Sequence, residues 1–104
     1  MKKMAALSLI LFSAQSSAET LEANIEKVGC HIDKNTCFVY IDKYIPSSCP
    51  SNDRSLRWNG DNPMNGRGAV SILLSAQTTG KLVTFGVNSC YDGFPTFQWL
   101  YMNN

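Results

Sequence analysis

Residues 65–88 read NGRGAVSILLSAQTTGKLVTFGVN, and this stretch decides the fold. In its first half the apolar side chains recur at helical spacing, at Ala69, Ile72, Leu73 and Ala76. Asn65 is a candidate N-cap, and Gly80 suits the left-handed position that follows a helix. A helix is therefore predicted over residues 67–78. In the second half, over 81–88, the apolar residues alternate as in a strand, at Val83, Phe85 and Val87.

Four further segments have the composition and alternation of strands. They are residues 21–32, 37–44, 54–59 and 96–102. The first is long, and its alternation changes phase at Glu26–Lys27, which predicts a bend or bulge there. The turn residues that follow it make the first two strands a hairpin.

Alternation also predicts which side chains share a face of a strand. The second strand has Val39 and Ile41 toward the core, and on its other face Phe38, Tyr40 and Asp42. The last strand is apolar on both faces, with Phe97, Trp99 and Tyr101 on one and Leu100 and Met102 on the other. We expect the outward aromatic residues of these two strands to mark contacts, including contacts between copies of the chain.

The order strand, strand, strand, helix, strand, strand predicts a mainly β protein with one helix. It matches a five-stranded, partly open barrel like the oligonucleotide/oligosaccharide-binding (OB) fold, with the helix closing one end. Ferredoxin-like and ubiquitin-like sheets are the alternative, but they place a helix after the first or second strand. We expect one such OB-fold-like domain over residues 19–104.

The first eighteen residues have the pattern of a secretory signal peptide. Lys2 and Lys3 precede an apolar run over 4–12, and small residues lead to a predicted cleavage after Ala18. The run is shorter than the roughly 20 residues of a membrane-spanning helix. The protein is therefore expected to be secreted or periplasmic, without a membrane span.

The chain has four cysteines, all after the predicted cleavage site. In an oxidising compartment an even number indicates disulfides, here two bridges with three possible pairings. Cys30 and Cys37 flank the turn of the predicted hairpin, as a cross-strand bridge requires. Zinc is the competing interpretation, but the gaps of six, eleven and forty residues do not match zinc-binding pairs. No metal or other cofactor is predicted.

No catalytic residues are predicted. His31 is the only histidine, and no serine or cysteine stands in a recognisable nucleophile motif. The aspartates fall in turns or on solvent faces, where turn formation explains them. The sequence therefore favours a binding protein over an enzyme.

Aromatic and polar residues in or near loops are the candidate ligand contacts. Aromatic rings can stack on the apolar face of a sugar while polar side chains bond its hydroxyl groups. The residues proposed for this role are Tyr91, Asp92, Phe94, Trp58 and Arg54, with Asn88 and Arg57 as further polar partners. Trp58 alternates with Leu56 and so also fits a position in the core.

The charge balance argues against nucleic acid as a ligand. The chain has nine Lys and Arg against eight Asp and Glu, and loss of Lys2 and Lys3 with the leader makes the mature domain slightly acidic. Proteins that bind single-stranded nucleic acid need a basic groove lined with aromatic residues. We therefore expect a glycan or a protein as the partner.

A longer pattern over residues 49–102 resembles a known family. It combines Cys49-Pro50, the helix that ends in Ala76-Gln-Thr-Thr-Gly-Lys, Cys90, and the closing strand FQWLYM at 97–102. It is similar to the pentamer-forming binding (B) subunits of subtilase-cytotoxin-like and pertussis-like toxins. The resemblance implies that Cys49 pairs with Cys90, and that the chain forms a homo-oligomer, as a pentamer, beside a catalytic partner. No sugar-contacting residue of that family has a match here.

The predicted function is thus a secreted or periplasmic, non-catalytic module that recognises a glycan or a protein partner. A toxin-B-subunit-like oligomer is one form of this prediction. The alternative is a monomeric periplasmic inhibitor or an envelope interaction protein.

Overall fold

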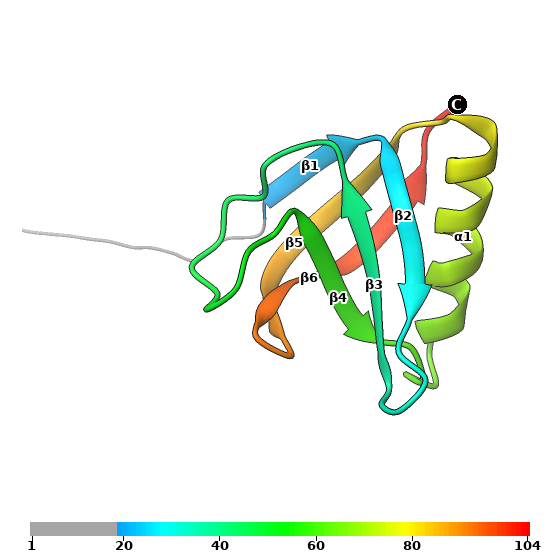
Figure 1. Ribbon diagram of the computed structural model, residues 1–104. Coiled ribbons are helices and arrows are strands. Elements are labelled where there is room, and N and C mark those ends of the chain that lie inside the picture. The colour runs from blue at the N-terminus through cyan, green and yellow to red at the C-terminus, as the bar shows by residue number, and fades with distance from the viewer. Residues whose placement is uncertain (1–18) are drawn as a thin grey trace, which may run out of the picture.

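The computed structural model describes residues 19–104; the predicted signal peptide, residues 1–18, lies outside the described residues. The described chain forms six strands and one helix (Figure 1). These are β1 (Glu19–Ala23), β2 (Ile25–Cys30), β3 (Thr36–Ile41), β4 (Ser55–Asn59), α1 (Gly66–Thr79), β5 (Val83–Tyr91) and β6 (Phe94–Met102). The prediction of a mainly β chain with one helix is confirmed.

The strands form two antiparallel sheets of three strands each, in the orders β1-β5-β6 and β2-β3-β4. The predicted number of five strands is therefore wrong: the described part of the chain has six strands, in two sheets that do not close into a barrel. The difference arises because the first predicted strand is divided in two. In Figure 1 the two sheets lie one in front of the other, with α1 along one side.

The first strand breaks at Asn24, between β1 and β2. β1 pairs with β5, whereas β2 pairs with β3, so the break carries the chain from one sheet to the other. Asp42 holds this corner: its carboxylate accepts hydrogen bonds from the backbone N–H of Asn24 at 2.9 Å and from its side-chain amide at 3.1 Å. A register shift between Ile25 and Lys27 confirms the predicted irregularity close to Glu26–Lys27.

The core lies between the two sheets and α1. β4 packs against β6, and α1 packs against β2 and β6. Trp58 is in this core, with its ring 5.1 Å from that of Phe97, and its indole N–H donates to the Gly66 carbonyl at 2.9 Å. The bond joins β4 to the start of α1. The buried apolar side chains are Ala23, Cys37, Val39, Ile41, Ile45, Leu56, Trp58, Ala69, Leu73, Ala76, Val83, Phe85 and Val87.

The helix follows its sequence signals closely. Gly80 ends it in the left-handed conformation, with φ of 73°, and the Gly80 N–H bonds to the Ala76 carbonyl. Asn65 stands at the N-cap position but makes no capping side-chain hydrogen bond. Ala69, Leu73 and Ala76 are buried, as the helical spacing predicts. Within residues 19–104 there is no helix with the length and hydrophobicity to cross a membrane.

A bulge in β6 changes which side chains share a face. Trp99 is the partner of Gly86, whereas Phe97 is the partner of the next residue, Val87, so Gln98 is an extra residue. Because of this bulge, Phe97 packs against the core while Trp99 and Tyr101 are exposed. The predicted common face of Phe97, Trp99 and Tyr101 is therefore wrong.

Both expected disulfides are present. Cys30–Cys37 joins directly paired residues at the end of the β2–β3 hairpin. Cys49–Cys90 connects the loop between β3 and β4 to β5, across 41 positions of sequence. That loop has no strand or helix of its own, so the bridge attaches it covalently to sheet β1-β5-β6.

We predict that the two disulfides contribute unequally to stability. Replacing both Cys49 and Cys90 by Ser should lower the free energy of unfolding by about 4 kcal/mol, because a long loop is released in the unfolded chain. The matched double variant at Cys30 and Cys37 removes a bridge that closes a much shorter loop. Its free energy of unfolding should therefore fall by only about 2 kcal/mol. Urea unfolding of the two oxidised variants measures the difference, and equal losses would contradict the prediction.

We also predict an acid-sensitive corner at Asp42. Hydrogen bonds from Asn24 hold the pKa of the Asp42 carboxyl below its ordinary value of 3.8. The stabilisation is therefore complete above the ordinary pKa and is lost as pH falls through the lowered one. Asp42→Ala should be less stable than the native chain near neutral pH, by an amount that shrinks in acid. Asp33→Ala, in an exposed loop, is the control; a pH-independent deficit in Asp42→Ala would oppose this explanation.

Candidate ligand-binding face

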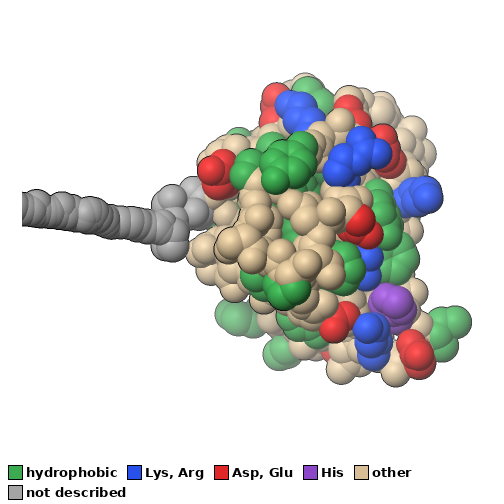
Figure 2. Space-filling view, turned by 60° about the vertical axis from the view of Figure 1, so that its left-hand side comes forward, with side chains coloured by type: hydrophobic (Ala, Val, Ile, Leu, Met, Phe, Trp, Pro, Cys, Tyr) green, Lys and Arg blue, Asp and Glu red, His purple; other side chains and the backbone are tan. Residues whose placement is uncertain are grey.

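The outer face of sheet β2-β3-β4 carries an aromatic cluster around one arginine. Phe38 and Tyr40 project from β3, and Arg57 stands directly opposite Phe38 on β4. Phe94, at the start of β6, covers the arginine from the other sheet. We call the surface formed by these four residues and Asp92 the Arg57 face. On the side of the molecule that carries the histidine, cationic and anionic side chains are interspersed with apolar ones (Figure 2).

Arg57 is a buried cation with stacking partners. The residue is only 8% exposed. Its guanidinium carbon lies 3.9 Å from the ring centre of Phe94, and 5.3 Å and 5.9 Å from those of Phe38 and Tyr40. Such contacts between a guanidinium and aromatic rings are attractive, because the ring face is electron-rich. The arginine thus attaches the β5–β6 hairpin to the face of the other sheet.

Two hydrogen bonds and one nearby carboxylate compensate the burial of the Arg57 charge. Arg57 Nε donates to Ser55 Oγ at 3.0 Å, and Nη2 donates to the Tyr40 hydroxyl at 3.2 Å. Asp53 lies 3.5 Å from Nη2. Burial alone would raise the pKa of the Asp53 carboxyl, but hydrogen bonds from Ser55 and Tyr40 and the charge of Arg57 outweigh it, so the pKa is lowered. Asp53 is therefore ionised at neutral pH and compensates the buried charge.

Asp92 joins the two loops that border the Arg57 face. It occupies the turn between β5 and β6 with φ of 54°. Its carboxylate accepts hydrogen bonds from Lys34 Nζ at 2.9 Å and from Thr36 Oγ1 at 3.4 Å, both near the β2–β3 turn. The hydrogen bond from Lys34 holds the pKa of Asp92 below its ordinary value. The two loops consequently form one continuous border.

The structure separates the residues predicted as ligand contacts. Asp92 and Phe94 belong to the Arg57 face. Tyr91 and Trp58 line a different hollow, of about 850 Å³, between the start of α1 and β6. Arg54 lies before β4 with φ of 67°, and its carbonyl accepts the Ile41 N–H; its side chain forms no hydrogen bond or ion pair within residues 19–104.

The predicted ligand contacts include Arg57 only as a further polar partner and do not include Phe38 or Tyr40. Alternation correctly places Phe38 and Tyr40 on the outer side of their strand. They are expected, however, to form a contact between copies of the chain and not a ligand site. Arg57 was expected only as a further polar partner. Their proximity depends on the pairing of β3 with β4, which brings Phe38 opposite Arg57. Alternation is the available signal: Phe38 and Tyr40 share one face of their strand, and Arg57, between Leu56 and Trp58, lies on the face opposite to theirs.

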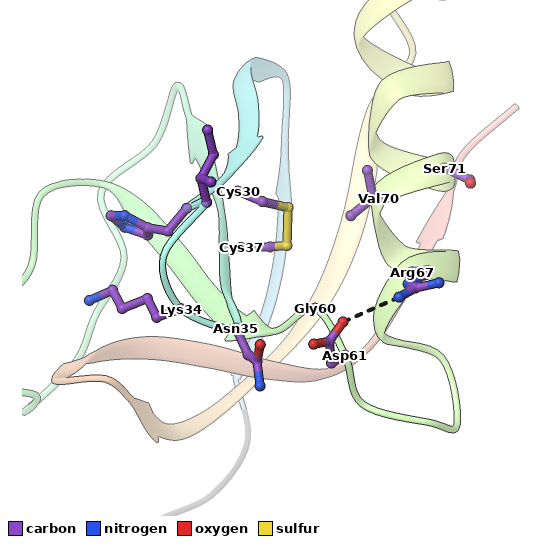
Figure 3. Close-up of a pocket in the computed structure, with 11 residues that line it drawn as sticks. Cys30, Lys34, Asn35, Cys37, Gly60, Asp61, Arg67, Val70 and Ser71 are labelled. Carbon is purple, nitrogen blue, oxygen red and sulfur yellow. Dashed lines mark hydrogen bonds and ion pairs between the residues drawn. A yellow bond between two sulfur atoms is a disulfide. The ribbon is translucent and has the colours of Figure 1, made fainter.

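A second hollow, of about 530 Å³, lies between the β2–β3 loop and α1 (Figure 3). The Cys30–Cys37 disulfide faces Val70 across it. Arg67 and Asp61 form an ion pair at its border, 3.4 Å apart. Within residues 19–104 no group of three His, Cys, Asp or Glu side chains is placed to hold a metal ion.

Comparison with known proteins adds no relative. No protein-family model matches the chain, and neither does a curated protein or a solved structure. The similarity to toxin B subunits therefore depends on the residues between 49 and 102 alone and stays a prediction.

We predict that Arg57 stabilises the fold as well as shaping the face. Arg57→Met should lower the free energy of unfolding by about 1–3 kcal/mol, since hydrogen bonds to a charged group are lost. It should also raise the pKa of Asp53, because the nearby positive charge is removed. Chemical unfolding and NMR titration of the carboxyl carbons measure the two effects.

The control is Arg67→Met. Arg67 also pairs with an aspartate, but its side chain is 88% exposed, so its loss should change stability by at most about 1 kcal/mol. Equal losses in the two variants would show that burial of Arg57 contributes nothing.

Proposed function

We propose that the protein is a secreted or periplasmic, non-catalytic module that binds a glycan on the Arg57 face. The observation that carries this proposal is the set of half-buried rings of Phe38, Tyr40 and Phe94 around a neutralised guanidinium. Aromatic surface with a few placed polar groups suits a ligand that has both C–H faces and hydroxyl groups.

The proposed fold supports this placement. We interpret the two sheets as halves of an open OB-like barrel whose first strand is broken at Asn24. OB folds bind oligonucleotides and oligosaccharides on the face of their second and third strands, between the loops after the first and fourth. The equivalent region here is the β3–β4 surface, between the β2–β3 loop and the β5–β6 turn. The Arg57 face occupies that region.

Charge favours a glycan over nucleic acid. The cations Arg57 and Lys34 are each paired with a carboxylate, Asp53 and Asp92. A polyanion needs a surplus of positive charge along its path. Hydroxyl groups, in contrast, accept from cations and donate to carboxylates, so a mixed surface suits them.

Export and assembly complete the proposal. Two disulfides in so small a domain suit an oxidising compartment, in agreement with the leader-like residues 1–18. The resemblance to toxin B subunits supports a ring of identical chains. Light scattering that gives the mass of a monomer at micromolar concentration would remove the ring from the proposal and leave the glycan-binding domain.

Glycan-array binding of the domain over residues 19–104 tests the ligand class. Phe38→Ala and Asp92→Asn should each weaken binding to the sugars found by about tenfold, as expected when one stacking or charged contact is lost. Asp92→Asn keeps the size of the side chain but loses the ion pair with Lys34, so circular dichroism and thermal unfolding of both variants must show that the fold is intact. Leu74→Ala, on the exposed side of α1, is the control. An array without ligands would overturn the proposal, as would full binding by both variants.

A further inference from the structure

The outer face of the other sheet, β1-β5-β6, carries two exposed aromatic rings in nearly one orientation. Trp99 and Tyr101 of β6 are 44% and 54% exposed. Their rings are inclined by only 7° to each other, with centroids 5.9 Å apart. We call this pair the aromatic shelf. It takes no part in the Arg57 face, which lies on sheet β2-β3-β4.

A glycine on β5 leaves room for the indole of Trp99. The partner of Trp99 on β5 is Gly86. A Cβ atom at Gly86 would stand 2.2 Å from Trp99 Cε2, so any other residue would displace the indole. Glycine within a strand weakens it by about 0.5–1 kcal/mol relative to alanine. Here the glycine allows a large aromatic ring to lie against the backbone while half of its surface stays in solvent.

Polar groups are fixed beside the rings. Thr84, the partner of Tyr101 across the β5–β6 pair, donates from Oγ1 to Asn103 Oδ1 at 3.1 Å. The Asn103 amide in turn donates to the Glu22 carboxylate on β1. Glu22 is exposed, so its carboxylate can accept further hydrogen bonds from a ligand. The shelf thus combines a flat apolar surface with an ordered chain of hydroxyl, amide and carboxylate.

We propose that the aromatic shelf is a second glycan site, for a neutral chain of pyranose units with equatorial hydroxyl groups. Such units present flat faces of C–H bonds, which are attracted to the electron-rich faces of aromatic rings. The two rings are stacked in parallel, and their exposed parts together offer an apolar surface to a sugar unit. The carboxylate of Glu22 can accept hydrogen bonds from sugar hydroxyl groups, and its negative charge repels anionic sugars. A protein partner is less suited, because protein interfaces insert projecting side chains into pockets, and the shelf consists of exposed rings beside a carboxylate.

Fluorescence gives a direct test, because the chain has only two tryptophans. Trp58 is 6% exposed and Trp99 is 44% exposed, so acrylamide quenching reports mainly on Trp99. Both rings border the hollow beside α1, so a change in fluorescence that persists in Trp99→Ala would come from Trp58 and would count against the shelf. The probes are tetrasaccharides of β-1,4-linked glucose and of β-1,4-linked N-acetylglucosamine, titrated into the disulfide-bonded domain. We expect saturable protection of Trp99 by at least one of them.

Variants separate the shelf from other sites. By isothermal titration calorimetry, Trp99→Ala and Tyr101→Ala should each weaken binding by about tenfold or more. Gly86→Ala should weaken it by displacing the indole. Leu74→Ala is the control, because Leu74 is 46% exposed and lies on α1, away from the shelf. Circular dichroism and thermal unfolding confirm that each variant is folded.

The outcomes distinguish this proposal from that for the Arg57 face. Phe38→Ala and Asp92→Asn should bind the tetrasaccharides as the native domain does. If neither tetrasaccharide binds, or if binding survives in both shelf variants, the second site is overturned whatever the Arg57 face does. A native dimer that Trp99→Ala converts to a monomer would also overturn it, because the shelf would then be a contact between copies.

Discussion

One corner, held by Asp42, makes the rest of the architecture possible. Because its carboxylate bonds the backbone and the side chain of Asn24, the chain can leave β5 as a partner and take up β3 within two residues. One short run of sequence therefore belongs to two sheets. The sheets enclose the core between them and direct two separate faces outward.

The two outer faces use aromatic residues in different ways. On the Arg57 face the rings surround a buried cation, whose hydrogen bonds and ion pair leave it neutralised. On the shelf, Trp99 and Tyr101 stack in parallel, with about half of each residue exposed to solvent. The first arrangement joins the two sheets and borders a loop-lined surface; the second leaves two rings open for stacking.

Some site residues were accessible from sequence and others were not. Asp92 lies in a turn close to a cysteine and Phe94 follows it at the start of β6, and turn residues with aromatic neighbours are recognisable locally. Phe38 and Arg57 are nineteen positions apart, and only the β3–β4 pairing makes them neighbours. For the aromatic shelf, alternation correctly puts Trp99 and Tyr101 on one face, but it adds Phe97 to them, and the bulge at Gln98 moves Phe97 to the core.

The sequence by itself determined the order of the elements, the helix and its end at Gly80, because periodicity and terminating residues act within a few positions of the chain. It also predicted both disulfides, one from the hairpin and one from a family resemblance. Only the tertiary structure decided the break at Asn24, the bulge at Gln98 and the burial of Arg57. Each of these depends on a partner from a distant segment, Asp42, β5 or Phe94, and local pattern carries no information about which distant segments meet.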